Sequence, residues 1–311
     1  MKVRISFPSL SESIIAISII AVFWIFTAVF IGFRPEHLVL ILFFCILFFL
    51  NKETGKLAVA LLPFYIFGIS YDWMRIIPNY TVNPVDVETL YNLEKSLFGI
   101  VDAGIRKIPS EYFATHRHPA ADFLSGIFYL GWVPVPLAFS FYLYLKKKRD
   151  IYLRFALVFL FTNILGFICY YIHPAAPPWY PMKYGFEPVL STPGNMAGLS
   201  HFDDMIHYPV FELIYGRNAN VFAAFPSLHS SYLVVALFYS IRGKNPVAIS
   251  AILALFMVGI WGTAVYTGQH YVIDVLGGIT CAFAGISLFE YGWMKLPFFQ
   301  RFFNKYLNYI V

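Results

Sequence analysis

The sequence predicts an all-α, polytopic membrane protein with about eight transmembrane helices. Hydrophobic residues make up 59% of the 311 residues, charged residues make up only 13%, and the mean hydropathy is +0.67. A soluble chain of this length would be nearer a quarter charged. Eight apolar runs supply the predicted spans, and they cover residues 13–32, 37–50, 57–77, 122–145, 151–172, 227–241, 247–266 and 271–290.

The second run, 37–50, is the weakest of these spans because a helix needs roughly 20 residues to cross a bilayer. If runs 37–50 and 57–77 form a re-entrant hairpin instead, both crossings disappear together. The orientation of every later run is then unchanged. We expect the first run to be retained as a span, since no small-residue cleavage site follows it.

The positions of the basic residues predict the orientation. Most of the 22 lysines and arginines flank the apolar runs on one side, in the short connections that the positive-inside rule assigns to the cytoplasm. Both termini are therefore expected inside, and the two long connections, 71–121 and 173–226, outside. The net charge of +5 accordingly indicates membrane orientation and gives no reason to expect a nucleic-acid partner.

The first long connection contains an amphipathic segment, VDVETLYNLEKSLFGI, at residues 85–100. Leu90, Leu93, Leu97 and Phe98 recur there at helical spacing. This stripe favours a helix that lies on the bilayer surface. A role in gating substrate is the alternative.

Two stretches carry the chemistry: AAFPSLHSSY at residues 223–232 and VYTGQHYVIDVLGG at residues 265–278. Each places a histidine where a loop becomes an apolar helix, and one apolar hairpin joins the two stretches. That hairpin returns His229 and His270 to the same end of the molecule. Asp274 follows His270 by four residues, so the two share one helix face.

The helix after Pro226 is expected to bind phosphate. Proline suits the first position of a helix, Ser227 caps the helix or contacts a ligand, and the free N–H groups there attract anions. An aspartate inside an apolar span is costly and needs a reason. Asp274 supplies one by accepting the Nδ1–H of His270, which leaves Nε2 free as a nucleophile or base. Two histidines and a carboxylate also make a metal triad, which is the alternative.

These stretches resemble the second and third motifs of the type 2 phosphatidic acid phosphatase superfamily, P-S-G-H and S-R-x5-H-x3-D. Within the superfamily, the chain looks most like the inositol phosphorylceramide synthases. The matching segments are Pro226-Ser227-Leu228-His229, His270-x3-Asp274 with its tail Val275-Leu276-Gly277-Gly278, Pro177-Pro178-Trp179-Tyr180 and Gly194-x2-Ala197-Gly198-Leu199-x3-Asp203.

The sequence departs from the superfamily pattern at the basic positions. Thr263 and Ala264 replace the serine and arginine of the third motif, so its phosphate-binding arginine is missing. An apparent first motif, Lys147-x6-Arg154, lies on the predicted cytoplasmic side. It is therefore a membrane thickness of roughly 30 Å away from the histidines.

Other residues must then contact the substrate. We expect Arg75, Lys183 and Arg217 to balance the phosphate charge, although each is also explained as a solvated or interfacial cation. Trp179 and Tyr180 are interfacial anchors or a wall of the lipid site. Asp203 and Ser227 complete the set of substrate-binding candidates.

The resemblance implies a metal-independent lipid phosphotransferase that uses no cofactor. His270 would form a phosphohistidine, Asp274 would orient it, and His229 would act as general acid and then general base. A phosphoinositol-like headgroup would move from a glycerophospholipid to a lipid alcohol such as ceramide. Membrane lipids are the expected partners, and we expect no obligatory protein partner.

The resemblance also implies a domain organisation. Residues 57–311 would form the catalytic core, built on six helices with the site at its extracytoplasmic end. Residues 1–56 would form accessory spans.

The sequence leaves two other functions open. A lipid phosphatase acting on phosphatidate, a prenyl pyrophosphate or a phosphoinositide phosphate would use the same catalytic residues with water as acceptor. The missing arginine favours a phosphodiester donor over a dianionic monoester. A transporter or membrane scaffold is the non-enzymatic alternative, and it predicts charged residues along a path through several spans.

Overall fold

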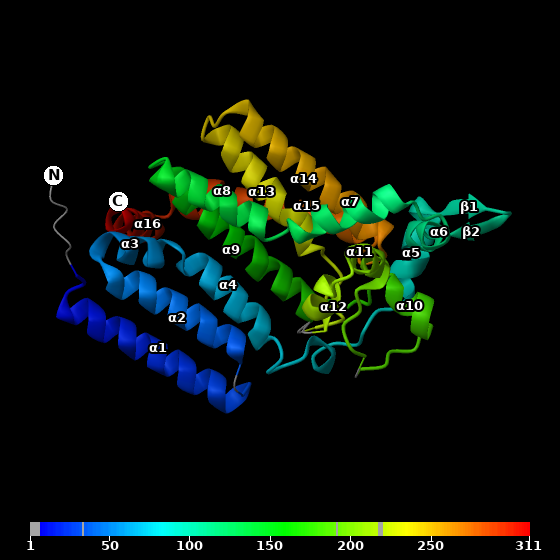
Figure 1. Ribbon diagram of the computed structural model, residues 1–311, viewed down its shortest axis with the longest axis horizontal. Coiled ribbons are helices and arrows are strands. Elements are labelled where there is room, and N and C mark those ends of the chain that lie inside the picture. The colour runs from blue at the N-terminus through cyan, green and yellow to red at the C-terminus, as the bar shows by residue number, and fades with distance from the viewer. Residues whose placement is uncertain (1–6, 33, 191, 217–219) are drawn as a thin grey trace.

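Apolar stretches of this chain form helices because a helix satisfies its own backbone hydrogen bonds without water. The computed structural model describes residues 7–32, 34–190, 192–216 and 220–311, and this part of the chain is mostly helical (Figure 1). The elements are α1 (Leu10–Phe30), α2 (Pro35–Leu50), α3 (Lys52–Ala60), α4 (Leu62–Trp73), α5 (Glu88–Phe98), β1 (Ile100–Asp102), β2 (Ile105–Lys107), α6 (Pro109–Thr115), α7 (Pro119–Leu130), α8 (Pro134–Leu145), α9 (Arg149–Ile172), α10 (Trp179–Tyr184), α11 (Ser200–Ile206), α12 (Val210–Tyr215), α13 (Leu228–Arg242), α14 (Val247–Tyr266), α15 (Val272–Ser287) and α16 (Pro297–Ile310).

Among the described residues, four helices are long and apolar enough to cross a membrane. They are α1, α9, α14 and α15 with its continuation to Lys295. Two further spans are bent by 46° at short breaks, between α3 and α4 and between α7 and α8, which gives up to six. Helices α2 and α13, with 16 and 15 residues, are shorter than the roughly 20 residues of a full span. A mostly helical membrane protein is thus confirmed, and the count of eight stays a prediction.

Helix α9 is the centre of the bundle. It packs against α4, α8, α13 and α15, while α13 also packs against α14, and α14 against α7. Its buried side chains include Phe155, Phe159 and Val158, each at most 1% exposed. The six packed elements are therefore α4, the α7–α8 pair, α9, α13, α14 and α15.

Helices α1 and α2 lie on one flank of this bundle, beside α3 and α4 (Figure 1). They contact it through aromatic pairs such as Phe26 with Trp73 and through a small cluster of Ala16, Phe48 and Ala58. Helix α3 continues across residue 56, where the sequence places the boundary of the accessory spans. That boundary stays a prediction.

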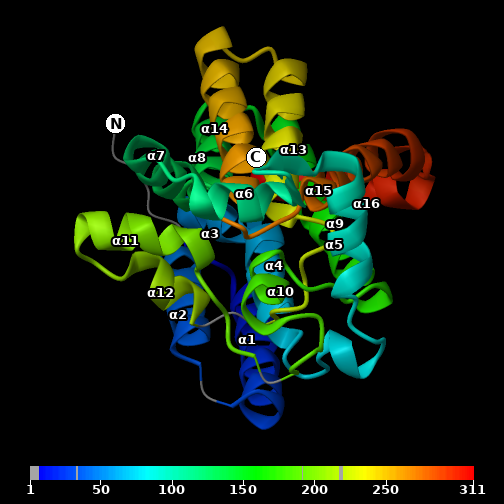
Figure 2. The ribbon, with the colours of Figure 1, turned by 90° about the vertical axis from the view of Figure 1, so that its right-hand side faces the viewer.

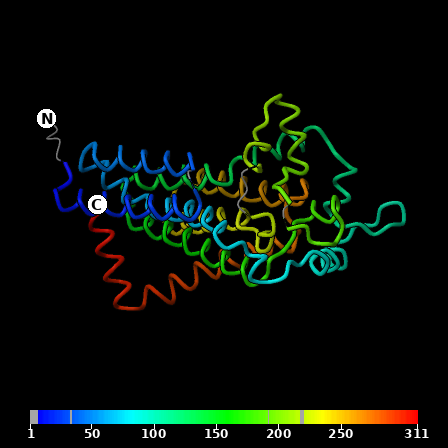
Figure 3. Tube along the Cα trace, turned by 90° about the horizontal axis from the view of Figure 1, so that it is seen from below, coloured from blue at the N-terminus to red at the C-terminus, as the bar shows by residue number. Residues whose placement is uncertain are grey.

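The long connections gather at one end of the bundle, which we call the loop end. Helix α1 begins, and α16 lies, at the opposite end (Figures 1 and 3). Figure 2 looks onto the loop end, where α5, α6 and α10–α12 lie over the ends of the long helices. The loop end also carries the small β1–β2 hairpin, an exception to the all-α expectation.

Backbone hydrogen bonds order the loop end. Ala175 forms parallel bridges with Asp86 on one side and Ala223 on the other, so both long connections meet the loop before α13. The buried Asn79 donates its side-chain amide to the carbonyl oxygens of Tyr170 and Phe222 at 2.9 and 2.7 Å. The loop before α13 is consequently held on several sides.

Helix α5 is amphipathic, as the sequence predicts, and it packs against α15. Leu93 and Leu97 are exposed, which suits a bilayer-facing side. Leu90 and Tyr91 are buried in a cluster with Tyr271. One face of α5 therefore belongs to the folded loop end, and only the other is available to lipid.

Candidate active site

The helices α13 and α15 begin side by side. The loop before α13 contains a cis peptide bond between Phe225 and Pro226, and the N–H of Ser227 donates to the Asp274 carbonyl oxygen at 2.9 Å. A Cβ on Gly278 would clash with the Ser227 carbonyl oxygen, so glycine permits this close approach. The glycine at the end of the motif after Asp274 is therefore explained by the close packing of α15 against the start of α13.

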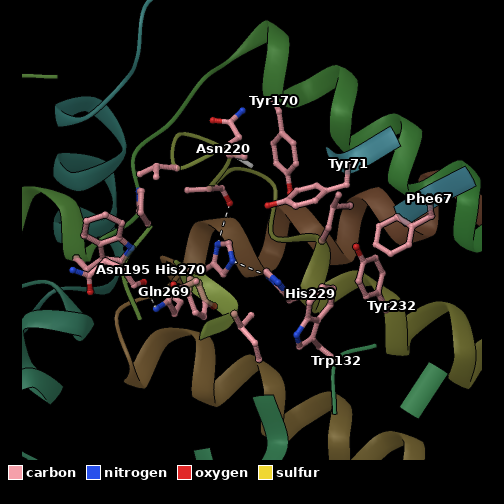
Figure 4. A pocket seen from close by; sticks show the side chains of 18 residues that line it. Phe67, Tyr71, Trp132, Tyr170, Asn195, Asn220, His229, Tyr232, Gln269 and His270 are labelled. Carbon is pink, nitrogen blue, oxygen red and sulfur yellow. Dashed lines mark hydrogen bonds between the residues drawn. The ribbon is translucent and has the colours of Figure 1, made fainter. Parts of the chain in front are cut away.

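The two predicted catalytic histidines meet at this junction. His229 Nδ1 lies 3.2 Å from His270 Nε2, and His270 Nδ1 lies 3.1 Å from the Ala224 carbonyl oxygen (Figure 4). A carbonyl oxygen can only accept, so the contact with Ala224 places the proton of His270 on Nδ1. His270 Nε2 is then an acceptor, and His229 Nδ1–H is its donor. The backbone thus selects the tautomer in which Nε2 of His270 carries a lone pair.

Asp274 lies beneath this pair. It is fully buried, its Oδ2 accepts the Tyr271 N–H at 2.8 Å, and the same oxygen lies 3.5 Å from His270 Nδ1. The shorter contact of Nδ1 is with Ala224, so Asp274 shares the orienting role that the sequence assigned to it alone. Both acceptors favour the same tautomer of His270.

Burial keeps His270 neutral. Desolvation lowers the pKa of this imidazole to about 4, and the hydrogen bond with Ala224 opposes the shift only in part. At neutral pH the ring therefore carries one proton, on Nδ1, and the lone pair of Nε2 remains available for nucleophilic attack.

Aromatic rings fix the position of His229. The Trp132 ring lies edge-on to it at 4.6 Å between centroids, and the Tyr129 ring lies at 5.3 Å. Trp132 lies in the break between α7 and α8. The bend in this span therefore brings an aromatic wall to the site.

A cavity of about 170 Å³ opens beside the two histidines and the first turn of α13. Figure 4 shows the histidines at its centre, with Tyr71 and Tyr232 on one side and Asn195 and Gln269 on the other. None of its lining residues, in the part of the chain that the structure describes, is lysine or arginine. Amide groups, hydroxyl groups and helix N–H groups are the polar contacts it offers.

A second cavity of about 210 Å³ adjoins the first and shares Trp179 and Asn195 with it. Lys183 and Arg117 line this second cavity. Arg117 pairs with Asp122 at 3.0 Å, whereas Lys183 is exposed. Two of the predicted substrate-binding residues, Trp179 and Lys183, thus lie at or near the histidines.

Other predicted binding residues have structural contacts elsewhere. The Ser227 hydroxyl accepts a hydrogen bond from Ser230 at 3.1 Å, and Ser227 lines neither cavity. The Tyr180 hydroxyl donates to the Glu187 carbonyl oxygen and accepts the Val189 N–H.

Asp203 and Arg75 also make structural contacts and line neither cavity. Asp203 accepts the backbone N–H groups of Phe211 and Glu212 and so caps α12, which contributes to the first cavity. Arg75 pairs with Asp72 at 2.9 Å at the end of α4. Arg217 lies outside the described residues. The substrate-binding roles of all these residues stay predictions.

Sequence reasoning missed several lining residues. Gln269 precedes His270 directly, and Asn195 lies inside the quoted Gly194–Asp203 motif, so both had a signal in adjacent residues. Trp132 had only the nearby Pro134, which marks a break in a helix. For the alternative of a metal triad, the described residues contain no group of three histidine, cysteine, aspartate or glutamate side chains arranged to bind an ion.

Comparisons with known proteins show which sequences this chain resembles. The PAP2 superfamily profile matches residues 90–288. The chain is 59% identical to the phosphoinositol dihydroceramide synthase of Bacteroides thetaiotaomicron over 97% of this chain and 99% of that protein. It is 25% identical to the inositol phosphorylceramide synthase catalytic subunit of Saccharomyces cerevisiae, over 81% of this chain and 61% of that protein.

A similar relation holds for the inositol phosphorylceramide synthase of Candida albicans, with 25% identity over 78% of this chain and 50% of that protein. The chain thus spans only part of the length of the two fungal relatives. No solved structure gives a significant match.

Proposed function

Because the chain belongs to the PAP2 superfamily, we propose that it transfers a phosphoinositol headgroup from a glycerophospholipid to a ceramide-type lipid alcohol. One observation carries the proposal. His270 Nε2, free of a proton, faces His229 Nδ1 at 3.2 Å beside a cavity at the mouth of α13. The names of the relatives, a phosphoinositol dihydroceramide synthase and an inositol phosphorylceramide synthase, indicate the headgroup and the acceptor.

In the first step, His270 Nε2 attacks the phosphorus of the donor lipid. A P–N bond forms and the P–O bond to the diacylglycerol oxygen breaks. His229 enters this step as the imidazolium, gives one proton to that oxygen and is left neutral. Attack requires the hydrogen bond between the two rings to break, because both nitrogens cannot remain 3.2 Å apart with phosphorus between them. Substrate binding therefore includes a small displacement of one imidazole.

In the second step, His229 removes the proton from the acceptor hydroxyl group. The hydroxyl oxygen attacks phosphorus, the P–N bond breaks, and His270 regains its lone pair. Water in place of the lipid alcohol would give hydrolysis. The choice between transferase and phosphatase is thus made by the acceptor and not by the catalytic residues.

The size of the site suits a lipid headgroup. Pockets that enclose a whole drug-sized ligand hold about 300–1,000 Å³, whereas the cavity at the histidines holds about 170 Å³. The phosphate enters this cavity, the polyol occupies the second cavity near Lys183, and the hydrocarbon chains stay in the bilayer. Lateral diffusion then delivers both substrates.

The charge of the site favours a phosphodiester. No lysine or arginine lines the cavity among the described residues, so a dianionic monoester would be poorly balanced there. A diester carries one negative charge, which the first turn of α13 can stabilise through its N–H groups. This agrees with the missing third-motif arginine at Ala264.

A purified-enzyme assay tests the proposal. Phosphatidylinositol labelled in its headgroup and dihydroceramide are supplied in mixed micelles, and the expected product is labelled phosphoinositol dihydroceramide. Release of free inositol phosphate instead would replace the transferase with a hydrolase. Turnover that appears only with phosphatidate would assign a phosphatase.

We also propose that the chain crosses the membrane eight times, with both termini cytoplasmic and the loop end outside. The basic connections support this orientation. After replacement of the three native cysteines, Val101→Cys in the β1–β2 hairpin should react with an impermeant maleimide in intact cells. Lys146→Cys, between α8 and α9, should react only after lysis, and the reverse pattern would invert the topology.

A further inference from the structure

Helix α5 carries one acidic side chain on its buried face. Glu94 is fully buried. The other charged residues of α5 are not: Glu88 is exposed and Lys95 is partly exposed. A buried carboxylate is costly unless it is paired or hydrogen-bonded. Its position therefore needs a specific partner.

The hydrogen-bond partners of Glu94 are backbone N–H groups of α15. Glu94 Oε1 accepts the N–H of Val272 at 2.9 Å, and Oε2 accepts the N–H of Ile273 at 3.2 Å. These are the first two residues of α15, and His270 precedes the first of them by two positions. Each oxygen of Glu94 thus binds a different donor of the turn that follows the nucleophile.

Glu94 and Asp274 together satisfy the start of α15. The first N–H groups of a helix have no partner within the helix. Asp274 accepts the N–H of Tyr271, and Glu94 accepts the next two. Without Glu94, the turn between His270 and Asp274 would leave two partly buried donors unpaired.

The same face of α5 touches the other support of His270. Leu90 and Tyr91 pack in one cluster with Tyr271 and with Ala224, whose carbonyl oxygen accepts the His270 Nδ1–H. Glu111 fixes α5 in turn, because it accepts the Tyr91 hydroxyl at 2.7 Å. Helix α5 therefore contacts both supports of the His270 ring. Glu94 binds the first turn of α15, and Leu90 and Tyr91 pack in the cluster that contains Ala224.

We infer that Glu94 is a positioning residue for the reaction, and that its carboxylate holds the α15 entry turn so that His270 Nε2 is aimed at phosphorus. The inference rests on the proposed nucleophilic role of His270. Both carboxylate oxygens accept N–H bonds at the positive end of a helix dipole, so the ionised form is the one that the turn binds. Burial raises the pKa of Glu94, and the two N–H bonds oppose that rise.

The substitution Glu94→Gln tests the role at constant size. It replaces one acceptor oxygen with an NH₂ group. One hydrogen bond to α15 is then lost, and the NH₂ group faces a backbone N–H that is also a donor. A misplacement of about 1 Å at a reacting atom costs about 10²-fold in rate. We expect kcat per folded enzyme to fall about 10²-fold, with the KM for phosphatidylinositol changed by less than about threefold.

Two variants accompany it. Glu94→Asp keeps the charge on a shorter arm, and it should recover at least part of the lost kcat. Glu88→Gln makes the same chemical change at an exposed position of the same helix, and its kcat should equal that of the parent enzyme. Folded enzyme is quantified by size exclusion in detergent; if Glu94→Gln does not fold, Glu94→Asp, with kcat reduced and KM retained, carries the test.

The outcomes separate the inference from the proposed function. If Glu94→Gln lowers the melting temperature but leaves kcat per folded enzyme within threefold, Glu94 is a stabilising residue only and the inference is wrong. His270→Ala is measured in the same assay. If that variant retains turnover, the proposed mechanism itself fails, whatever Glu94→Gln does.

Discussion

Helices α1 and α9 have similarly apolar sequences, yet the structure uses them differently. Only 11% of the residues in the apolar stretch of α1 are buried inside the protein, against 61% of those in α9. Helix α9 packs against four other elements of the bundle that carries the histidines. Apolar character therefore predicts that a segment lies in the membrane, whereas contacts decide whether it supports the site or faces lipid.

The largest expected effect is at the centre of the packed region. His270→Ala removes the proposed nucleophile, and turnover should fall by at least about 10⁴-fold. Incubation with donor lipid alone and rapid acid-free quenching should trap a labelled phosphohistidine in the parent enzyme and not in this variant. His229→Ala should still form that intermediate, slowly, because it lacks only the acid–base group.

An unchanged phosphoenzyme level in His270→Ala would move the nucleophile elsewhere. The matched control is His201→Ala, on α11, since His201 lines neither of the two cavities. That variant should keep the parent rate.

The next effect is on protonation. Burial lowers the pKa of His270 from 6.5 to about 4, so the folded protein holds the imidazole neutral where the unfolded chain would protonate it. The unfolded state then binds more protons between these values, and His270 makes stability fall as pH drops from about 6.5 toward 4. Above the unfolded pKa this loss is absent.

Histidine labelled with ¹³C and ¹⁵N makes this measurable by NMR in nanodiscs. The His270 resonance, assigned by its loss in His270→Ala, should show a neutral ring from pH 8 down to 5. A midpoint near 6.5 would show that water reaches the ring freely and that the site is not desolvated.

A smaller effect concerns the approach of α15 to α13. Gly278→Ala places a Cβ against the Ser227 carbonyl oxygen, and such overpacking costs about 1–3 kcal/mol. We expect a lower melting temperature together with a roughly tenfold loss of kcat, since His229 lies in the first turn of α13 and His270 directly precedes α15. Gly262→Ala on α14 is the control, because an added Cβ there has no neighbour within 4 Å.

If both glycine variants behave alike, the close contact at Gly278 is unimportant for the site. A loss of stability at Gly278→Ala with an unchanged kcat would show that the alignment of the two histidines tolerates a shift of α15.

Much of the site could be predicted from sequence because its parts are local. Asp274 follows His270 by only four residues, and its Oδ2 lies 3.5 Å from His270 Nδ1. One apolar hairpin is enough to bring His229 to the same end, which follows from span length. The expected shared helix face is wrong, because α15 begins at Val272 and His270 lies in the loop before it. The bends at α3–α4 and α7–α8 also had a signal, in Pro63 and Pro134, which the apolar runs concealed.

The roles of single polar side chains could not be predicted in the same way. Glu94 binds a backbone group 178 residues further along the chain, and Asp203 accepts backbone N–H groups at the start of α12. Residue type shows which bonds a side chain can make, while the tertiary fold chooses the partner. The leucine pattern of α5 predicted a bilayer-facing side and gave no reason to expect a role for Glu94. Glu94 lies on the buried side of the helix, whereas Leu93 and Leu97 are exposed.

The smallest expected effect is on the flank formed by α1. Ile19 is 64% exposed there, so its side chain contacts lipid whether or not α1 is docked, and Ile19→Ala should change stability by less than about 0.5 kcal/mol. Phe159→Ala on α9 removes a ring that is 1% exposed, and it should cost about 3–5 kcal/mol. Melting temperature and kcat of both variants, in one detergent, measure the contrast between the helices. A loss of activity in Ile19→Ala at unchanged stability would mean that the lipid-facing side of α1 takes part in the reaction, and the distinction between supporting and lipid-facing helices would no longer follow from burial.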